Sequence, residues 1–161
     1  MGHELAGELA ACDIRHRTFR AEPLAFSSQH SAIERQSPEI KDFRDLLVWQ
    51  KAHLLTLSSY RATDTFPKAE TYGLTIQIRR CAASIAADIA EGCGKRGNGE
   101  FQRFLNIACG SGSELEYHFL LARDLAFLSD VDYQKLNQGV VEVKRMLASL
   151  ARKVEAELHA N

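Results

Sequence analysis

Residues 101–126 read FQRFLNIACGSGSELEYHFLLARDLA, and this stretch decides the fold. Apolar or small side chains recur along it at alternating intervals of four and three residues. A heptad spacing of this kind puts them on one side of an α-helix and is typical of helices that pack nearly parallel to each other. The stretch therefore predicts a long helix in a helical bundle. The positions are Phe101, Leu105, Ala108, Gly112, Leu115, Phe119, Ala122 and Ala126.

The next segment repeats the pattern at intervals of three and four residues. Ser129 stands before it and is followed by Asp130 and Asp132, which supply an N-cap and an acidic first turn. The segment therefore predicts another long helix. Its apolar positions are Tyr133, Leu136, Val140, Val143, Leu147, Leu150 and Val154.

Two more helices are predicted upstream, over about residues 43–63 and 72–91. The first ends near Phe66-Pro67, because a proline disfavours helical backbone at the residue before it. The second combines one apolar stripe with alanines over most of the remaining surface. Small side chains let a neighbouring helix approach closely, so we expect this helix to be central. Its stripe is Leu74, Ile78, Cys81, Ile85 and Ile89.

Together these segments predict an all-α fold, an antiparallel up-down-up-down four-helix bundle over residues 43–161. Residues 1–42 have scattered apolar positions, so we expect a poorly structured, mobile N-terminal extension with at most a short helix over about residues 4–14. Two additional leucine stripes favour either a second buried surface for self-association or a wide face turned to the core. One stripe consists of Leu121, Leu125 and Leu128, and the other of Leu54 and Leu57.

The charge balance limits the classes of function. Lys and Arg total 20 and Asp and Glu total 21 in 161 residues, a net charge of −1. The extension has 5 basic and 7 acidic residues, which leaves 15 (20 − 5) and 14 (21 − 7) in the bundle. A uniformly basic nucleic-acid coat is excluded, whereas a local basic patch is not.

The cysteines and the apolar runs bear on compartment. Cys12, Cys81, Cys93 and Cys109 form no C-x-x-C pair, so we expect no structural zinc site. Acidic residues interrupt the N-terminus where a secretory leader would be apolar, and no run is long enough for a membrane span. The prediction is a reduced, cytoplasmic protein without a membrane partner.

The loop between the second and third helices, GCGKRGNG at residues 92–99, contains a literal G-x-G-x-x-G. Dinucleotide binding needs a strand before that motif, and here a helix is expected, so we interpret the match as accidental. A phosphate-binding P-loop fails as well, because Ile89 stands at its first glycine and Arg96 at its Ser/Thr. We expect Gly92 to close the preceding helix and Gly97 or Asn98 to cap the following one.

Basic residues cluster around this loop and upstream of it. Arg79 and Lys95 are separated by 16 residues, or about 24 Å of helix. One compact pocket is therefore not expected, whereas a linear track along a phosphate backbone fits. The competing interpretation is surface charge paired with Asp88, Glu91 or Glu100. The candidate nucleic-acid-binding residues are Arg79, Arg80, Lys95, Arg96 and Arg103.

Catalytic patterns give little support for an enzyme. A di-iron bundle needs Glu-x-x-His repeats, and the sequence has none; Glu114 and His118 are four residues apart. No Ser–His–acid or Cys–His constellation is indicated either. We expect no catalytic residues, no metal and no cofactor.

Residues 41–161 resemble a known family. The stretch KDFRDLLVWQKA at residues 41–52 is similar to the start of the 23S rRNA intervening-sequence proteins. Agreement continues over about three quarters of the chain, in the right order. The matching positions are Phe66-Pro67, Tyr72-Gly73-Leu74-Thr75, Arg79-Arg80, Ser84-Ile85, Ala90-Glu91-Gly92, Glu100-Phe101, Arg103-Phe104-Leu105, Gly110-Ser111, Glu114-Leu115-Glu116, Leu128 and Tyr133.

The resemblance implies an antiparallel four-helix bundle that assembles as a ring, reported for relatives as a homopentamer. A related branch comprises accessory proteins of diversity-generating retroelements, which bind nucleic acid and a reverse transcriptase. Carried over by position, Arg79, Arg80, Arg96 and Arg103 match recurrent basic sites, and Lys95 is a further basic site in the loop. The family usually has Ser or Thr where this chain has Gly97, and residues 1–40 have no counterpart.

Two hypotheses follow. The first is a non-enzymatic homo-oligomeric bundle that binds RNA or DNA through phosphate contacts from its arginines, with little sequence preference. The alternative is an oligomeric scaffold for protein partners, whose arginines pair internally with Asp88, Glu91 and Glu114.

Overall fold

The computed structural model describes residues 42–160, and our predictions for residues 1–41, including the short helix over residues 4–14, lie outside the described residues. Within residues 42–160 the chain forms four α-helices and two short 3-10 turns, and no strand. The helices are α1 (Leu47–Thr63), α2 (Leu74–Gly94), α3 (Asn98–Asp124) and α4 (Asp130–His159), and the turns are η1 (Phe43–Asp45) and η2 (Lys68–Glu70).

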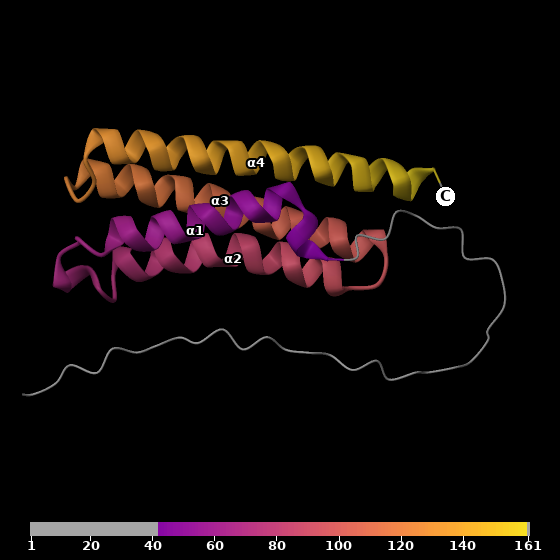
Figure 1. The fold of residues 1–161 in the computed structure, drawn as a ribbon, viewed down its shortest axis with the longest axis horizontal. Coiled ribbons are helices and arrows are strands. Elements are labelled where there is room, and N and C mark those ends of the chain that lie inside the picture. Colours follow the sequence, from indigo (N-terminus) through magenta and orange to yellow (C-terminus); the bar gives the residue numbers. More distant parts are fainter. Residues whose placement is uncertain (1–41, 161) are drawn as a thin grey trace, which may run out of the picture. The chain divides into compact units, whose positions relative to one another are not determined.

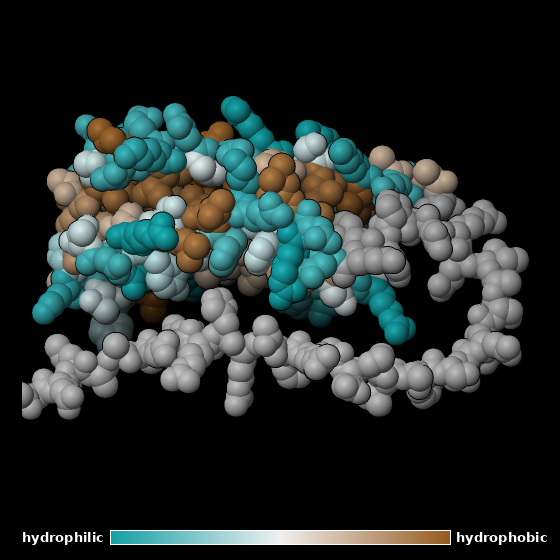
Figure 2. All heavy atoms as spheres, viewed as in Figure 1, coloured by the Kyte–Doolittle hydropathy of each residue, from teal (hydrophilic) through white to brown (hydrophobic). Residues whose placement is uncertain are grey.

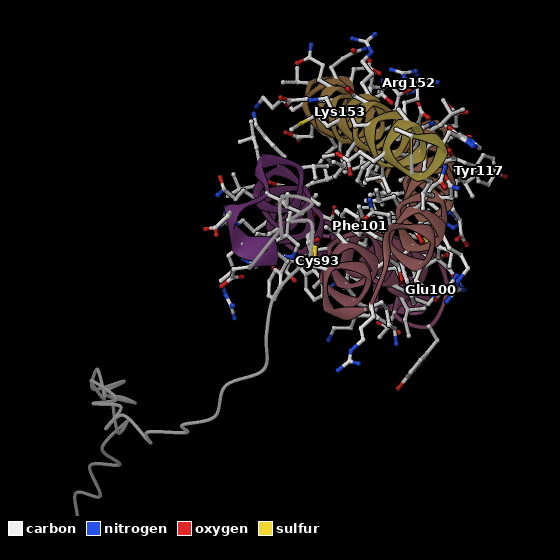
Figure 3. All side chains as sticks on the ribbon, turned by 90° about the vertical axis from the view of Figure 1, so that its right-hand side faces the viewer. Cys93, Glu100, Phe101, Tyr117, Arg152 and Lys153 are labelled. Carbon is white, nitrogen blue, oxygen red and sulfur yellow. The ribbon has the colours of Figure 1, made fainter. Side chains whose placement is uncertain are left out.

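The helices form an up-down-up-down bundle, as the sequence predicts (Figure 1). Helix α2 packs against α1 and α3, and α4 packs against α3 and α1, so the four helices enclose one core. The end-on view in Figure 3 shows this arrangement, with Phe101 of α3 pointing into the middle. Connections are short because each helix runs back beside the previous one.

The heptad positions of α3 and α4 line the core. From Phe101 to Ala122, each seam position of α3 is buried. In α4 the buried positions are Leu136, Val140, Val143, Leu147 and Val154, with Leu150 and Tyr133 partly buried against the core. The capping prediction for α4 is also confirmed, because the Ser129 hydroxyl accepts a hydrogen bond from the Asp132 amide at 3.1 Å.

The prediction that Ala126 is the last buried position of this helix is wrong. Helix α3 ends at Asp124, and Ala126 is exposed with φ 58°. The amide of Phe127 then donates back to the Ala122 carbonyl at 2.8 Å, a helix-ending arrangement that reverses the chain. This reversal carries Leu128 into the core.

The first helix begins later than predicted. Asp42 accepts a hydrogen bond from the Arg44 amide at 2.9 Å and starts the separate turn η1. Leu46 then has extended backbone, with ψ 116°, before α1 begins at Leu47. The Asp42 side chain therefore caps a separate turn, and residues 43–46, which we predicted to be helical, lie outside α1.

Gly92 does not close α2. The helix continues to Gly94, and Gly92 is buried within it. A Cβ at Gly92 would lie 2.8 Å from the Phe104 Cβ, so the glycine allows α3 to approach closely. Gly97 is the N-cap of α3 and has φ 90°, which confirms the prediction that Gly97 or Asn98 caps that helix.

The two leucine stripes have different fates. Leu121 packs partly buried against the core and Leu128 belongs to it, whereas Leu125 is exposed. Leu54 and Leu57 of α1 are exposed as well. Leu121 at the end of α3 and Leu128 in the turn after it thus face the core, and α1 keeps an apolar outer face.

Candidate nucleic-acid interface

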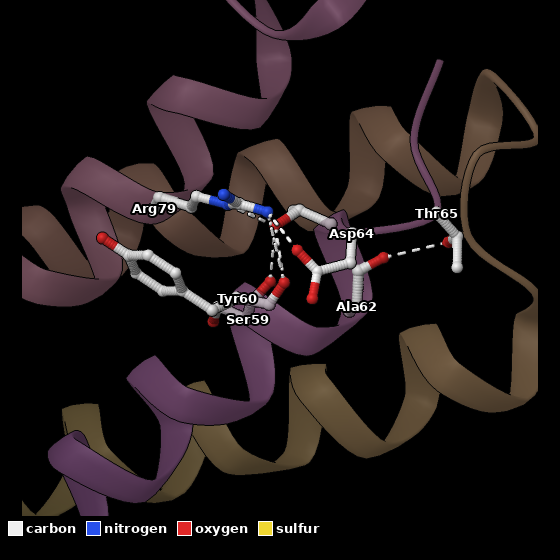
Figure 4. A network of polar contacts seen from close by, with 7 residues as sticks. Ser59, Tyr60, Ala62, Asp64, Thr65 and Arg79 are labelled. Carbon is white, nitrogen blue, oxygen red and sulfur yellow. Dashed lines mark hydrogen bonds and ion pairs between the residues drawn. The ribbon is translucent and has the colours of Figure 1, made fainter. Parts of the chain in front are cut away.

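Arg79 is committed to the structure of the bundle. Its Nε donates to the Thr63 hydroxyl at 2.8 Å and its Nη2 to the Asp64 carboxylate at 2.7 Å (Figure 4). The guanidinium lies 4.9 Å from the centre of the Tyr60 ring. Only 28% of the side chain is exposed. Arg79 therefore connects α2 to the end of α1, and its Nε and Nη2 groups are both bonded within the bundle.

Arg80 points toward α3 instead. Its Nη2 donates to Glu114 at 2.9 Å and to the Gln77 side chain at 3.0 Å. Its side chain is 59% exposed, so this ion pair is solvated and weak. Although Arg79 and Arg80 are adjacent in sequence, Arg79 contacts the end of α1 and Arg80 contacts α3.

The structure brings Lys95 and Arg103 together. The Lys95 Nζ lies 5.6 Å from the centre of the Phe104 ring and the Arg103 guanidinium lies 4.5 Å from it. The ring is itself buried between the helices, so it provides a fixed platform for both cations. Arg96 follows Lys95 and is exposed, with no ion pair within residues 42–160. We call Lys95, Arg96 and Arg103 the loop cluster.

Carboxylates accompany the loop cluster. Lys95 pairs with Glu91 at 3.1 Å and Arg103 with Glu100 at 3.0 Å, as the competing interpretation of the sequence expects. Both pairs are about half exposed and lie within one turn of helix. Such pairs exchange readily with solvent or with another anion, because each contributes about 0.5 kcal/mol or less. The cluster keeps an excess of one positive charge (three cations, two carboxylates).

The five sequence candidates thus do not form one site. The loop cluster lies at the end of the bundle where α2 meets α3, while Arg79 and Arg80 lie within the first two turns of α2. Sequence reasoning missed Phe104 as the residue that gathers the cations. The available signal was its position directly after Arg103, but the contact with Lys95 depends on how the loop turns.

A second group of polar side chains joins α2 to α3. The Cys81 sulfur, a Glu114 carboxylate oxygen and a His118 ring nitrogen all lie within 4.8 Å of one another. Burial, followed by the nearby Glu114 carboxylate, raises the pKa of the Cys81 thiol to about 11. The sequence showed only the Glu114–His118 spacing, and the third group comes from another helix.

A groove lined by both apolar and charged side chains runs between α1 and α4. It has a volume of about 600 Å³, and its lining includes Leu54, Leu55, Phe127, Leu136 and Val143. Figure 2 shows hydrophobic surface along this groove, bordered by hydrophilic residues of the two helices.

No helix among the described residues is long and apolar enough to cross a membrane.

The fold and this site define a class of antiparallel four-helix bundles with a basic turn between the second and third helices. The chain belongs to the 23S rRNA-intervening sequence protein family, which it matches over residues 44–149. This confirms the resemblance drawn from the sequence.

The fold is similar to that of a protein of unknown function from the S23 ribosomal protein family of Bacteroides thetaiotaomicron, solved as a crystal structure. The two share 22% sequence identity and superpose with a TM-score of 0.62, over 66% of this chain and 96% of the other. That similarity concerns the fold alone. Among curated proteins, none matches the chain.

Proposed function

We propose that this protein is a non-enzymatic, self-associating helical bundle that binds RNA, or nucleic acid in general, through the loop cluster. The observation that carries the proposal is the Phe104 ring, which contacts both Lys95 and Arg103 while Arg96 is exposed next to Lys95 in the sequence. Cations held in place lose less conformational entropy when they meet phosphates than free side chains do.

Three cations per chain support weak, sequence-independent binding. Phosphate contacts set the position of a protein on nucleic acid and carry no sequence information themselves. The net charge of −1 offers no general attraction, so the cluster must act locally. Repetition of the cluster around an oligomer would multiply these contacts along one strand.

Self-association is supported by the outer face of α1. Leu54 is 59% exposed and lines the α1–α4 groove, and Leu57, 38% exposed, lies on the same helix. Exposed leucines that are bordered by polar residues are typical of an interface between proteins. The family resemblance favours a ring of five copies. A cytoplasmic site of action accompanies the proposal, since Cys81, Cys93 and Cys109 are free thiols.

The test is a fluorescence-anisotropy titration of the full chain with a labelled single-stranded RNA at several salt concentrations. Three phosphate contacts predict a log–log slope of about −2 per chain. Exchanging Lys95, Arg96 and Arg103 for Glu should abolish binding. A charge-matched control exchanges Lys68, Arg123 and Arg145 for Glu, because these residues lie outside both the loop cluster and the α1–α4 groove. An equal loss in both triple variants would contradict an interface at the loop cluster.

A second candidate is an oligomeric protein-interaction scaffold without nucleic-acid binding. The observation that favours it is the pairing of four candidate cations with carboxylates, Arg79 with Asp64, Arg80 with Glu114, Lys95 with Glu91 and Arg103 with Glu100. In that case the wild type shows no salt-dependent binding to RNA or DNA, yet it still self-associates through α1.

A further inference from the structure

We propose that Cys81, Glu114 and His118 form a binding site for a zinc-type divalent metal ion between α2 and α3. The inference does not depend on nucleic-acid binding, because the three residues lie outside the loop cluster. It also differs from the expectation drawn from the sequence, which found no metal-ligand spacing.

The geometry is close to that of a metal site. The three ligand atoms lie within 4.8 Å of one another. In a tetrahedral zinc site, bonds of about 2.0–2.3 Å put neighbouring ligand atoms about 3.5 Å apart. The cluster therefore has to contract by about 1 Å. The Glu114 Oε1 and the His118 Nε2 are already 3.7 Å apart, and the Glu114 side chain, which is 46% exposed, can adjust its position.

His118 provides the strongest indication. Both ring nitrogens, Nδ1 and Nε2, are buried, and neither has a hydrogen-bond partner within residues 42–160. The Glu114 Oε1 lies 3.7 Å from Nε2, which is too far for a hydrogen bond. A buried polar group without a partner costs about 1–3 kcal/mol, so such groups call for an explanation. A metal ion bonded to one ring nitrogen would supply the missing partner.

Cys81 supplies the soft ligand. Its side chain is 1% exposed, and at neutral pH the sulfur carries its proton because the thiol pKa is raised to about 11. When the ion binds, the S–H bond breaks, the proton leaves to solvent and a sulfur–metal bond forms. The positive charge of the ion then replaces the proton in a site where a bare thiolate would be unfavourable.

Arg80 orients the carboxylate. Its Nη2 contacts the Glu114 Oε1 at 2.9 Å, and this oxygen is also the one that lies 3.7 Å from the His118 Nε2. Second-shell contacts of this kind fix a ligand and tune the affinity of a metal site. Three protein ligands leave the fourth tetrahedral position to water, on the side where Glu114 is exposed.

The ligand set selects the kind of ion. Thiolate and imidazole suit zinc and cobalt(II), whereas magnesium and calcium require oxygen ligands. Cobalt(II) is therefore a suitable spectroscopic probe, because it takes the same tetrahedral geometry and absorbs visible light when it does.

The test uses the full chain, reduced and freed of metal, titrated with cobalt(II) and then with zinc. We expect one cobalt ion per chain, with visible tetrahedral bands and a sulfur-to-cobalt charge-transfer band that zinc abolishes. Cys81→Ala and His118→Gln should each weaken binding by more than about 100-fold, and Arg80→Gln by about 10-fold. Cys109→Ala is the matched control, since Cys109 lies on α3 outside the cluster.

A second readout covers variants that fold poorly. Zinc at about 100 times its dissociation constant should raise the melting temperature of the wild type by about 10 °C and leave that of Cys81→Ala unchanged. The N-terminal extension also contains possible metal ligands, Cys12, His3 and His16. They are present in the wild type and in Cys81→Ala alike, so a difference between the two proteins reports on the site in the bundle. A charge-transfer band that persists in Cys81→Ala, or no cobalt binding at micromolar concentration, would overturn the proposal.

Discussion

At the scale of the residue, Arg79 and Arg80 show how neighbouring arginines take on different roles. Arg79 donates to the Thr63 hydroxyl, the Asp64 carboxylate and the Tyr60 carbonyl, while Arg80 makes exposed contacts. Arg79→Ala should lower the free energy of unfolding by about 2 kcal/mol, because it removes hydrogen bonds from a charged, largely buried group. Arg80→Ala should cost about 0.5 kcal/mol or less. Urea denaturation of both variants measures the difference, and equal costs would contradict a structural role for Arg79.

Asp88 is a residue at which stability should depend on pH. Its Oδ2 is buried without a partner in the described part of the chain. Burial, followed by the charge of Glu91, raises the pKa of this carboxyl. The folded state therefore prefers the protonated acid, and the ionised form destabilises it above the folded-state pKa.

Asp88→Asn should accordingly stabilise the protein at pH 7, by about 1 kcal/mol. The gain should disappear as the pH falls below about 4, where Asp88 is protonated in both the folded and unfolded states. Thermal unfolding across this pH range provides the measurement. A gain that stays constant at low pH would mean that charge is not its cause.

At the scale of the element, Gly92 sets the spacing of α2 and α3. A Cβ there would lie 2.8 Å from the Phe104 Cβ and 3.0 Å from Phe101 Cδ2. Gly92→Ala should therefore lower the free energy of unfolding by about 1–3 kcal/mol through overpacking. Gly94→Ala is the control, because its Cβ meets nothing within 4 Å and alanine is the better helix former. Urea denaturation measures both free energies of unfolding. A larger loss in Gly94→Ala than in Gly92→Ala would contradict close packing at Gly92.

At the scale of the whole molecule, the outer face of α1 predicts the assembly state. Leu54 is exposed and its neighbour Leu55 is 5% exposed. The double variant Leu54→Asp, Leu57→Asp should reduce the mass seen by light scattering to that of one 18.0 kDa chain and leave the helical content intact. Leu55→Asp should instead unfold the bundle, because it buries a charge. A wild type that is already a single chain at micromolar concentration would contradict self-association.

Much of the fold can be predicted because apolar residues recur in the sequence with the period of an α-helix. The seam from Phe101 to Ala122 and the stripe from Leu136 to Val154 alternate by three and four residues, and a helix with that pattern has one face to bury. Ser129 likewise marks the start of α4 through a contact made within one turn. Such features depend on residues close in sequence, so they can be read without tertiary information.

The tertiary structure decided what depends on residues far apart in the chain. Phe104 gathers Lys95 and Arg103 because the loop turns the end of α2 onto α3. Gly92 lies inside α2, where the demands of packing outweigh its tendency to end a helix.

Cys81 joins Glu114 and His118 only because α2 and α3 are neighbours. The sequence by itself thus determined the helices, their order and the bundle they form, since each follows from local periodicity. The side chains that meet between helices were decided by the relative rotation and spacing of those helices, which the packing of the complete core fixes.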